Sequence, residues 1–351
     1  MARLFSPLRL RGMTIRNRVV MSPMSQNAAD RGCVGAWHLV HYGSRAVGGC
    51  GMVMLEDTAI APSGRVSTRS LCLYSIAHAH AMSRVVEFCK SNGTAVGVQL
   101  SHAGRKARRD RQGRGGKLVS STSDPFDAGW KAPVQLEEIE IAEVVGAFAN
   151  SARLALQAGV DAVEVHAAHG YLLHQFLSPM TNRREGVYGG PTGGVKLLRE
   201  VCRAVRSAAP DLVIFARLPA HDGIDSGLSR EAVVEISAGL LSDHLVDVID
   251  VGGNGVAGGA PPLGAADMVA SAAQIRSSTG GVVASGGLGA SGETADAALA
   301  DGLCDLVVVG RPLLADPYWV AHQADRLGGP SLLPERYQLA RGEASPTYPA
   351  A

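Results

Sequence analysis

An alternation between short apolar runs and longer amphipathic segments constrains the fold of this chain more than any other feature. The apolar runs are rich in valine and isoleucine and are nearly uninterrupted, which is typical of parallel strands buried on both faces. Eight such runs occur, at 19–24, 52–60, 95–102, 161–169, 212–218, 247–253, 281–287 and 305–311. We therefore expect eight parallel strands.

Helical patterns fill the intervals between these runs. Ser229 and Ser291 each precede such a pattern, and Glu231 and Glu293 follow them in the first turn. A serine at this position caps free backbone N–H groups, and an acid there faces the positive end of the helix. The clearest predicted helices lie at 139–158, 194–209, 230–241 and 292–300.

The order of these elements predicts the fold class. Eight strand–helix alternations with no linker between them favour an α/β protein with a (β/α)8 TIM barrel, a single domain over residues 1–351. A doubly wound sheet is the alternative. The segment LRLRGMTIRNR at 8–18 alternates with a period of two around Gly12, which predicts a β-hairpin that closes the bottom of the barrel.

Composition limits the partners of the chain. Its 351 residues are 46% hydrophobic and carry a formal net charge of +1, which gives no electrostatic reason to expect nucleic acid or a membrane surface. No apolar run reaches the roughly 18 residues of a membrane helix, and the first residues lack the apolar core of a signal peptide. Six scattered cysteines without a C-x-x-C pair indicate reduced thiols and no structural metal. We expect a cytoplasmic protein that acts on a small molecule.

Polar residues collect at the carboxyl ends of the predicted strands, where TIM barrels carry their active sites. His102 ends the third strand, His166 and His169 end the fourth, and Arg217 ends the fifth. We therefore expect these side chains to face one pocket. The spacing H-x-x-H has two other interpretations, satisfied core histidines or a metal pair, but zinc would need a third ligand and the nearby acids are scattered.

Glycines end the last two strands, in ASGGLG at 284–289 and VVGRPLL at 308–314. The loops after these two strands form the usual phosphate site of a barrel, because glycine lets backbone N–H groups approach the oxygens and arginine adds a bidentate charge. The ligand is either a phosphorylated substrate or a phosphate-bearing cofactor such as FMN. Neither a P-loop nor a dinucleotide fingerprint is present. The predicted phosphate-binding residues are Gly286, Gly287, Gly310 and Arg311.

Several stretches resemble the Old Yellow Enzyme family of FMN-dependent ene-reductases. They are LFSPLRLRGMTIRNRVVMSPM at 4–24, GVQLSHAGRKA at 97–107, HAAHGYLLHQFLSP at 166–179 with YGG at 188–190, and VGRPLLADP at 309–317. They occur in the order of the family and cover nearly the whole chain. The short loops and PERYQLARG at 334–342 look most like the bacterial, thermophilic-type branch. The resemblance implies non-covalent FMN, reduction by NAD(P)H, and transfer of a hydride to an activated alkene such as an enone.

The resemblance also implies where the cofactor binds. Gln99 would hydrogen-bond the pyrimidine end of the flavin, and Arg217 would stand beside the N1–O2 edge, where negative charge accumulates on reduction. The glycine loops and Arg311 would hold the phosphate. The residues expected along the flavin edge are Ser22, Pro23, Met24, Ser25 and Asp57.

Substrate roles follow from the same resemblance. His166 and His169 would donate hydrogen bonds to the carbonyl oxygen of the substrate. Tyr171 would protonate the α-carbon, since a phenol stays protonated at neutral pH. The resemblance implies that Asn27, Lys106 and Arg341 line the substrate pocket. In the thermophilic-type branch the C-terminal arginine comes from a neighbouring subunit, so we expect a homodimer or homotetramer whose tail, about 328–351, reaches its partner.

Three residues depart from the pattern of the family. Ser25 stands where the branch usually has a cysteine, Asn27 where it has a tyrosine, and Asp57 where it has a small residue. Asp57 either points at the flavin N5 and O4 or turns away and bonds the loop backbone. These departures motivate a second hypothesis, a specialised biosynthetic relative that dehydrogenates, oxygenates or isomerises one intermediate. A non-catalytic binding protein on a barrel scaffold is a third hypothesis.

Overall fold

A computed structural model describes residues 2–107 and 117–337 of the chain. Its centre is a closed barrel of eight parallel strands, each paired with the next and the last paired with the first. The strands in barrel order are β3 (Val19–Met21), β4 (Met52–Ala59), β6 (Ala95–Ser101), β9 (Ala162–His166), β10 (Val213–Pro219), β11 (Val248–Gly252), β12 (Val282–Ser285) and β13 (Leu306–Val309). All eight predicted strands form, and the TIM barrel is confirmed.

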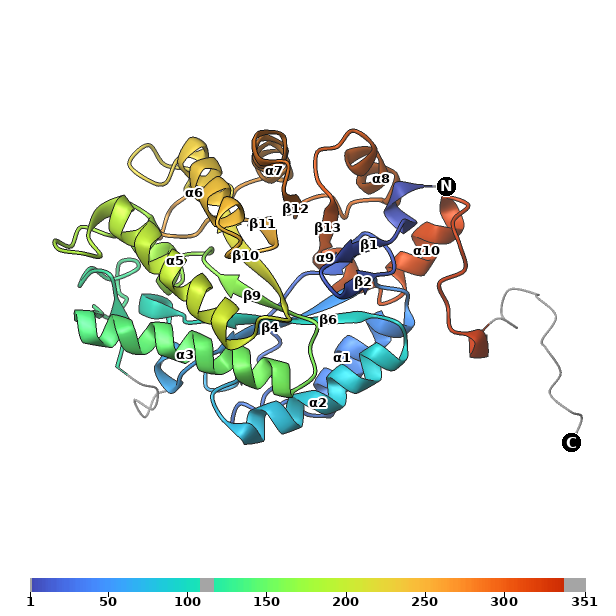
Figure 1. The fold of residues 1–351 in the computed structure, drawn as a ribbon, viewed down its shortest axis with the longest axis horizontal. Helices are drawn as coiled ribbons and strands as arrows, with labels where there is room; N and C mark the ends of the chain where they lie inside the picture. The colour runs from blue at the N-terminus through green and yellow to red at the C-terminus, as the bar shows by residue number, and fades with distance from the viewer. Residues whose placement is uncertain (1, 108–116, 338–351) are drawn as a thin grey trace, which may run out of the picture.

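Helices surround the strands (Figure 1). Because both faces of each strand are covered, by helices outside and by side chains inside, the strands are apolar along almost their whole length. The helices are α1 (Ala36–Val47), α2 (Ile76–Ser91), α3 (Glu138–Gln157), α4 (Leu172–Leu177), α5 (Gly190–Ala208), α6 (Arg230–Ser242), α7 (Ala265–Thr279), α8 (Gly292–Ala300), α9 (Arg311–Ala315) and α10 (Trp319–Arg326). Short 3₁₀ turns occur at Arg3–Phe5, Pro62–Gly64 and Gly104–Lys106.

The predicted caps and helices are confirmed. The Ser229 side chain accepts a hydrogen bond from the N–H of Ala232 at the start of α6, and the Ser291 side chain accepts one from Thr294 at the start of α8. The four predicted helices correspond to α3, α5, α6 and α8, although α5 begins four residues earlier than expected. Helix α7 was not singled out in the sequence, because the Gly- and Pro-rich stretch at 252–264 precedes it.

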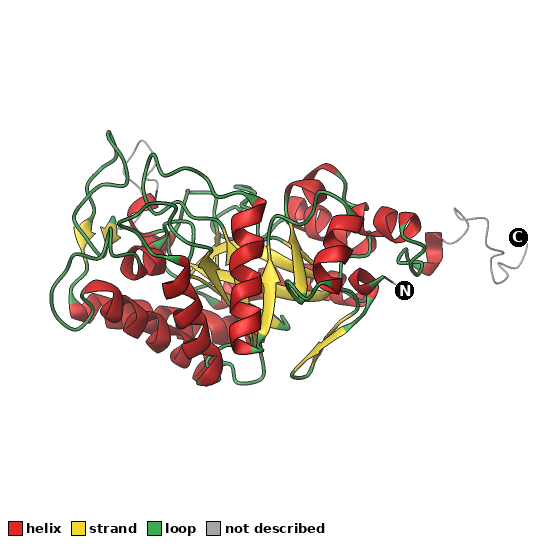
Figure 2. Cartoon of the chain, turned by 90° about the horizontal axis from the view of Figure 1, so that it is seen from above, coloured by secondary structure: helices red, strands yellow, loops and turns green. Residues whose placement is uncertain are grey.

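The N-terminal hairpin closes the amino-terminal end of the barrel, as predicted. Strands β1 (Leu8–Leu10) and β2 (Met13–Ile15) pair antiparallel, and Leu10, Met13 and Ile15 pack into the barrel interior. Figure 2 shows this hairpin on the side of the barrel opposite most of the long loops. Three further short strands lie outside the barrel, β5 (Leu71–Cys72), β7 (Val119–Ser120) and β8 (Val134–Gln135).

The interior of the barrel changes character along its axis. Towards the amino-terminal ends the inward-facing side chains form an apolar cluster that includes Met52, Ala162, Phe215 and Val248. Since strand residues alternate between the two faces, the inward positions nearer the carboxyl ends are the polar or charged Gln99, Glu164, Arg217 and Asp250. The apolar layer stabilises the barrel, and the polar layer forms the floor of the open end.

Within the described residues, no helix has the length and apolarity needed to cross a membrane.

Candidate active site

A hollow of about 720 Å³ lies at the carboxyl-terminal end of the barrel. Its volume falls within the range of small-molecule and cofactor sites. It is lined from the ends of several strands, because parallel strands in a closed barrel all end on the same side. The lining residues are Ser22, Met24, His169, Arg217, Gly253, Met268, Gly286, Gly287, Gly289, Ala290, Val308, Gly310, Arg311 and Pro312.

The predicted phosphate-binding residues meet at one part of this hollow. Gly287 has a φ of 85°, and a Cβ atom on it would lie 2.7 Å from the Cα of Ala265, so only glycine fits there. A Cβ on Gly310 would meet nothing closer than 3.5 Å, so its absence leaves room at the hollow. Arg311 is exposed and makes no ion pair with any described residue. The backbone and the free guanidinium together suit an anionic group.

A buried charge cluster forms the floor of the hollow. The Arg217 Nε lies 3.4 Å from the Asp250 Oδ2, and both side chains are nearly inaccessible. On the neighbouring strand the Gln99 amide donates to the Glu164 Oε1 at 2.7 Å. Burial, and then the nearby Asp250 carboxylate, raise the pKa of Glu164 well above its ordinary value. The protonated form of Glu164 is therefore favoured, and Asp250 is the ion-pair partner of the arginine.

Two polar atoms of this cluster lack a partner among the described residues. The Arg217 Nε and the Asp250 Oδ1 are buried, and neither is hydrogen-bonded. Buried polar atoms are normally hydrogen-bonded, and the ion pair of Arg217 with Asp250 leaves this N–H without a hydrogen bond in the described residues. Arg217 thus offers a donor and a positive charge to a ligand.

His166 and His169 come together at the rim of the hollow. The His166 Nε2 and the His169 Nδ1 are 3.2 Å apart, and the His166 Nδ1 faces the N–H of Ala168 at 3.4 Å. Because a backbone N–H can only donate, we assign the His166 proton to Nε2, which donates to His169. The proton of His169 then lies on its own Nε2, directed away from His166. Only His169 lines the hollow itself.

Both imidazoles are neutral. Burial lowers the pKa of His166 well below its ordinary value, and the charges of Arg217 and Lys106 act in the same direction. The same causes lower the pKa of His169. A neutral imidazole of fixed tautomer is a directed hydrogen-bond donor, which suits the binding of a neutral carbonyl oxygen.

Tyr171 and Lys106 lie beside the two imidazoles. The Tyr171 ring contacts the His166 ring edge-on, with centroids 4.9 Å apart. The Lys106 Nζ donates to the carbonyls of His169 at 2.9 Å and Gly255 at 3.3 Å. Lys106 therefore stabilises the loops at the rim as well as lying next to the predicted substrate position.

Ser25 and Asp57, two residues that depart from the pattern of the family, are hydrogen-bonded to each other. A β-bulge between Leu55 and Thr58 interrupts the alternation of β4 and re-aims the Asp57 side chain. The Asp57 Oδ1 accepts from the Ser25 hydroxyl. Asp57 therefore pairs with a side chain, and its approach to the flavin N5 and O4 stays a prediction. Asn27 has a φ of 51°, and its Oδ1 accepts from the Ser67 hydroxyl at 2.7 Å.

Asp57 should make stability depend on pH. The ordinary pKa of an aspartate is 3.8. Burial, and then the neighbouring Glu56, raise the pKa of Asp57 to about 7. Between pH 4 and 7 the unfolded carboxyl ionises while the folded one stays protonated, so this group costs stability as pH rises and the loss is complete above about pH 7. Asp57→Asn should remove that cost. We expect its unfolding free energy to rise relative to the native protein across this window, by up to about 4 kcal/mol.

Urea unfolding of both proteins from pH 4 to 8 measures the effect. The exposed Asp301 supplies the control, because Asp301→Asn removes a carboxyl group from the surface, where a charge contributes little to stability. A pH-independent difference for Asp57→Asn would mean that the folded carboxyl titrates normally.

Some predicted site residues do not line the hollow. Among the described residues the lining includes Ser22, Met24, His169, Arg217 and the phosphate-binding set, and omits Pro23, Ser25, Asn27, Asp57, Gln99, Lys106, His166 and Tyr171. Arg341 lies outside the described residues.

His102 does not share the pocket of the other strand-end residues. It lies in a smaller cavity of about 170 Å³ with Ser63 and Leu136. The His102 Nδ1 accepts from the N–H of Gly104 at 3.1 Å, and its Nε2 faces the Ser63 hydroxyl at 3.2 Å. The strand-end position was predicted correctly, but the strand is followed by a turn that directs the ring outward from the barrel.

Sequence reasoning missed several residues of the site. Glu164 and Asp250 carried a readable signal, because each is an acid within a nearly continuous apolar strand. Gly289 and Val308 stand within the glycine-rich strand ends that were singled out. Met268, on α7, carried no signal, since it reaches the hollow only through the course of the preceding loop.

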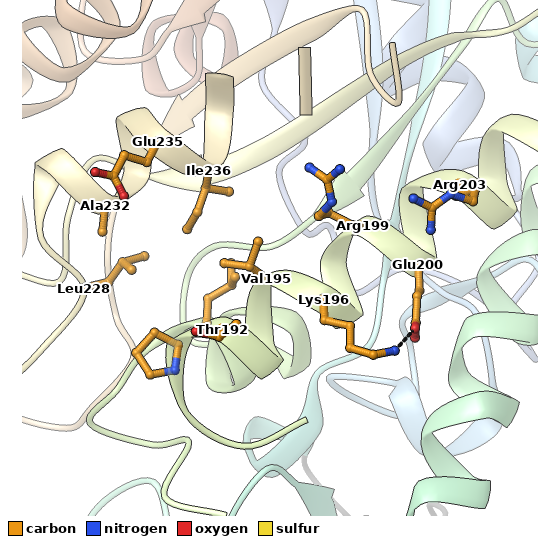
Figure 3. Close-up of a pocket in the computed structure, with 12 residues that line it drawn as sticks. Thr192, Val195, Lys196, Arg199, Glu200, Arg203, Leu228, Ala232, Glu235 and Ile236 are labelled. Carbon is orange, nitrogen blue, oxygen red and sulfur yellow. Dashed lines mark hydrogen bonds and ion pairs between the residues drawn. The ribbon is translucent and has the colours of Figure 1, made fainter. Parts of the chain in front are cut away.

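A second hollow lies on the outside of the barrel, between α5 and α6 (Figure 3). Its volume is about 590 Å³, and its floor is apolar, with Val195, Leu228 and Ile236. Lys196 and Glu200 pair with each other at its edge. It contains neither the imidazoles nor the glycine loops, so the site at the end of the barrel is the candidate active site.

Among the described residues no cluster of histidine, cysteine, aspartate and glutamate could hold a metal ion. The candidate site contains instead an anion-binding end, a buried cation and a pair of neutral imidazoles.

The chain is similar to known proteins over nearly its whole length. The profile of the NADH:flavin oxidoreductase / NADH oxidase family matches residues 3–327. A NADPH dehydrogenase of Listeria monocytogenes (serotype 4a, strain HCC23) is 40% identical over 345 residues, 97% of this chain and 99% of the relative. A NADPH dehydrogenase of Geobacillus sp. (strain WCH70) is 38% identical over 328 residues, 93% of this chain and 94% of the relative. The structure of morphinone reductase superposes with a TM-score of 0.80 at 26% identity, covering 94% of this chain and 91% of that one.

These similarities confirm the resemblance to the bacterial Old Yellow Enzymes, and the chain belongs to the NADH:flavin oxidoreductase / NADH oxidase family.

Proposed function

We propose that this enzyme reduces activated C=C bonds, such as those of enones, at the expense of NAD(P)H. As a member of its family it is an FMN-dependent NAD(P)H oxidoreductase. The finer assignment, an alkene next to a carbonyl group, rests on one observation. Two neutral imidazoles, His166 and His169, meet at the rim of a hollow whose floor carries a buried arginine and whose far part suits a phosphate.

The residues of the hollow fit FMN. Gly287, Gly310 and Arg311 would hold the phosphate, and Arg217, whose Nε has no hydrogen bond among the described residues, would place its positive charge beside the ring system. When bound, FMN would supply the two-electron redox chemistry that links NAD(P)H to the alkene. The buried positive charge of Arg217 favours an anionic ligand above it with little reorganisation.

The imidazoles and the phenol supply the rest of the proposed chemistry. The His169 Nε2–H would donate to the carbonyl oxygen of the substrate, which withdraws electrons from the β-carbon. His166 would hold the His169 ring through its own Nε2–H and turn to the same oxygen once the substrate is bound. Tyr171, whose ring packs on His166, would give its hydroxyl proton to the α-carbon. Lys106 would stabilise the surrounding loops, and Asn27 would contact the substrate.

The test is turnover of 2-cyclohexen-1-one by the FMN-loaded enzyme under anaerobic conditions. We expect cyclohexanone to appear in a one-to-one ratio with the NADPH consumed. Absence of the saturated product with cyclohexenone, a maleimide and a nitroalkene would contradict the proposal, whatever the rate of NADPH oxidation.

A second candidate function rests on the hydrogen bond between Ser25 and Asp57. It is a specialised relative that dehydrogenates, oxygenates or isomerises one intermediate. The Asp57 carboxyl group near the predicted flavin edge would change the electrostatic environment of that edge. Such a change would favour another reaction type. Saturated ketones converted to enones, with oxygen as the only acceptor, would support this candidate over the first.

Arg311 should determine the preference for FMN over riboflavin. Arg311→Ala removes one guanidinium from the proposed phosphate site, and charge-assisted hydrogen bonds are worth about 1.5–3 kcal/mol, so we expect FMN affinity to fall about 10- to 100-fold. Riboflavin lacks the phosphate, and its affinity should not change. Fluorescence titration of the apoprotein with each flavin gives the ratio of the FMN and riboflavin affinities. Arg9→Ala, at the opposite end of the barrel, is the control and should change neither affinity.

We also propose a cytoplasmic location and an oligomeric assembly for this enzyme. All six cysteines are unpaired, and Cys50, Cys72, Cys89, Cys202 and Cys304 are buried, which is consistent with a cytoplasmic enzyme. We propose a homodimer or homotetramer acting on a small molecule, with no nucleic-acid or membrane partner. Light scattering of the purified enzyme tests the assembly.

A further inference from the structure

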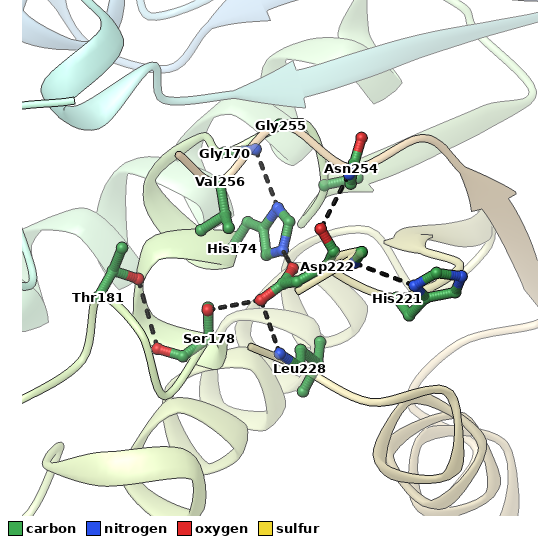
Figure 4. A network of polar contacts seen from close by, with 12 residues as sticks. Gly170, His174, Ser178, Thr181, His221, Asp222, Leu228, Asn254, Gly255 and Val256 are labelled. Atoms are coloured by element: carbon green, nitrogen blue, oxygen red, sulfur yellow. Dashed lines mark hydrogen bonds and ion pairs between the residues drawn. The ribbon is translucent and has the colours of Figure 1, made fainter. Parts of the chain in front are cut away.

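We propose that His174 and Asp222 form a buried positioning pair that holds the turn at His169–Tyr171 in the conformation needed by the active site. The inference rests on the proposed function for the roles of His169 and Tyr171. Figure 4 shows the pair within a network of polar contacts that includes Gly170, Ser178 and Leu228. Neither residue lines the hollow, and both ring nitrogens of His174 are engaged by Gly170 and Asp222, so we assign the pair a positioning role.

His174 connects the turn to Asp222. It lies on α4, and its side chain is fully buried. Its Nδ1 accepts from the N–H of Gly170 at 2.9 Å, and its Nε2 lies 2.7 Å from the Asp222 Oδ1. A backbone N–H can only donate, so Nδ1 must be the acceptor and the proton lies on Nε2. The ring therefore transmits the position of the Asp222 carboxylate to Gly170.

Asp222 is well suited to fix that ring. It follows β10 and is fully buried, and its Oδ2 accepts from the Ser178 hydroxyl at 2.6 Å and from the N–H of Leu228 at 2.7 Å. Burial alone would raise the pKa of Asp222, but the hydrogen bonds from His174, Leu228 and Ser178 together lower it. The carboxylate is thus ionised, and an ionised acceptor holds the Nε2–H tautomer of His174.

The turn at Gly170 needs such support. His169 has a φ of 56° and Gly170 a φ of 69°, so two successive residues occupy the left-handed region, which is unfavourable for a residue with a side chain. A Cβ on Gly170 would lie 2.0 Å from the carbonyl oxygen of Gly255, so the turn is also pressed against the next loop. This conformation turns the His169 ring back towards His166.

Three polar backbone atoms of the turn have side-chain partners. Lys106 donates to the carbonyl of His169 at 2.9 Å, and Gln175 donates to the carbonyl of Gly170 at 2.7 Å. The third is the N–H of Gly170, and His174 is its acceptor. Loss of that acceptor would leave a buried N–H unpaired within the most strained part of the loop.

The network also links the neighbouring loops. Asn254, after β11, donates to the carbonyls of Asp222 at 2.9 Å and Pro261 at 2.8 Å. It directly precedes Gly255, whose carbonyl touches the turn. The loops after β9, β10 and β11 are therefore joined through Asp222, and the catalytic turn takes its position from two other strands.

Two substitutions of His174 separate positioning from simple burial. Asparagine places an amide oxygen near the position of Nδ1 and can accept from Gly170, but it cannot reach Asp222. Glutamine places an amide N–H near the position of Nε2 and can donate to Asp222, but it leaves Gly170 without an acceptor. If the role of His174 is to hold the turn, His174→Asn should keep the activity and His174→Gln should lose it.

We expect His174→Gln to lower kcat/KM for the enone about 100-fold, the scale of a misplacement near 1 Å, while FMN stays bound. His174→Asn should stay within about fivefold of the native enzyme. Amide hydrogen exchange, followed by mass spectrometry in a peptide covering 169–172 of the FMN-loaded enzyme, should be faster in His174→Gln and near native in His174→Asn. The exchange measurement needs no turnover, so it tests the pair even if no enone is reduced.

Asp222→Asn gives a second test if His174→Asn fails to fold. The amide of Asp222→Asn must turn its N–H groups towards either His174 or the donors Ser178 and Leu228. Facing His174, the amide donates to Nε2 and moves the ring proton to Nδ1, which can then no longer accept from Gly170. We expect faster exchange in the same peptide and a loss of activity comparable to that of His174→Gln. Ser178→Ala is the matched control, because it removes one bond from Asp222 but leaves the His174 contact, and exchange should stay native.

Native exchange and native activity in His174→Gln would overturn the inference. The inference would also be overturned if His174→Asn and His174→Gln, both folded, lost the same factor in kcat/KM. It would likewise be overturned if Ser178→Ala speeded amide exchange in the peptide 169–172 as much as His174→Gln. In those cases the pair would stabilise the barrel generally and would not position the turn.

Discussion

Replacing Arg217 by methionine should destabilise the protein by about 3–5 kcal/mol, the cost of leaving one partner of a buried ion pair uncompensated. The side chains of Arg217 and Asp250 are 8% and 2% exposed, and Glu164 lies in the same polar layer. Without the guanidinium, Asp250 must take up a proton or admit water. Urea unfolding at pH 7 measures the loss. Arg276→Met is the control, because its pair with Asp305 is partly exposed and should be worth no more than about 1 kcal/mol.

The double variant Arg217→Met/Asp250→Asn separates stability from function. Removing both charges should recover most of the lost stability, since neutral side chains tolerate the buried layer. The rate of flavin reduction by NADPH should nevertheless stay about 100-fold below native, because the positive charge at the floor of the hollow is still missing. If the double variant also recovers the native rate of flavin reduction, Arg217 serves only to compensate the charge of the buried acidic residues.

Replacing Tyr171 by phenylalanine should slow alkene reduction by about 100- to 10,000-fold, the contribution typical of a positioned general acid. Phenylalanine keeps the ring that packs on His166 and removes only the hydroxyl. Flavin reduction by NADPH should be unchanged, because that step needs no proton at carbon. Reoxidation by a quinone should also be unchanged, since its protons go to oxygen.

Stopped-flow measurement of the separate half-reactions tests this prediction. The native enzyme and Tyr171→Phe would be reduced by NADPH, then mixed with cyclohexenone or with benzoquinone. An equal loss of the reoxidation rate with cyclohexenone and with benzoquinone would indicate that the substitution disturbs the site as a whole. Native rates with cyclohexenone would assign the proton to another group.

The barrel could be predicted from the sequence because it depends on local patterns. Apolar runs of strand length and amphipathic segments of helix length are properties of neighbouring residues, and the alternation of eight of each leaves few folds. The end of β9 was predicted three residues too late. The residues after His166 in this run include two alanines and give no sign of a break, but His169 and Gly170 take left-handed conformations, and the strand ends at His166.

The site could be predicted only in part. The glycine ends of β12 and β13 and the position of Arg217 follow from strand ends, which the sequence shows directly. The pairing of Arg217 with Asp250 depends on which strands are neighbours in the closed barrel, and the bond between Ser25 and Asp57 depends on a β-bulge. His174 and Asp222 are 48 residues apart, so their contact follows only from the completed fold.

A single-turnover experiment tests the central claim most directly. The FMN-loaded enzyme is reduced with one equivalent of NADPH in the absence of oxygen and is then mixed with 2-cyclohexen-1-one. We predict that the yellow colour bleaches with NADPH, returns with the enone, and yields one cyclohexanone for each flavin. Colour that fails to bleach, or that bleaches and does not return while no saturated ketone forms, would contradict the account.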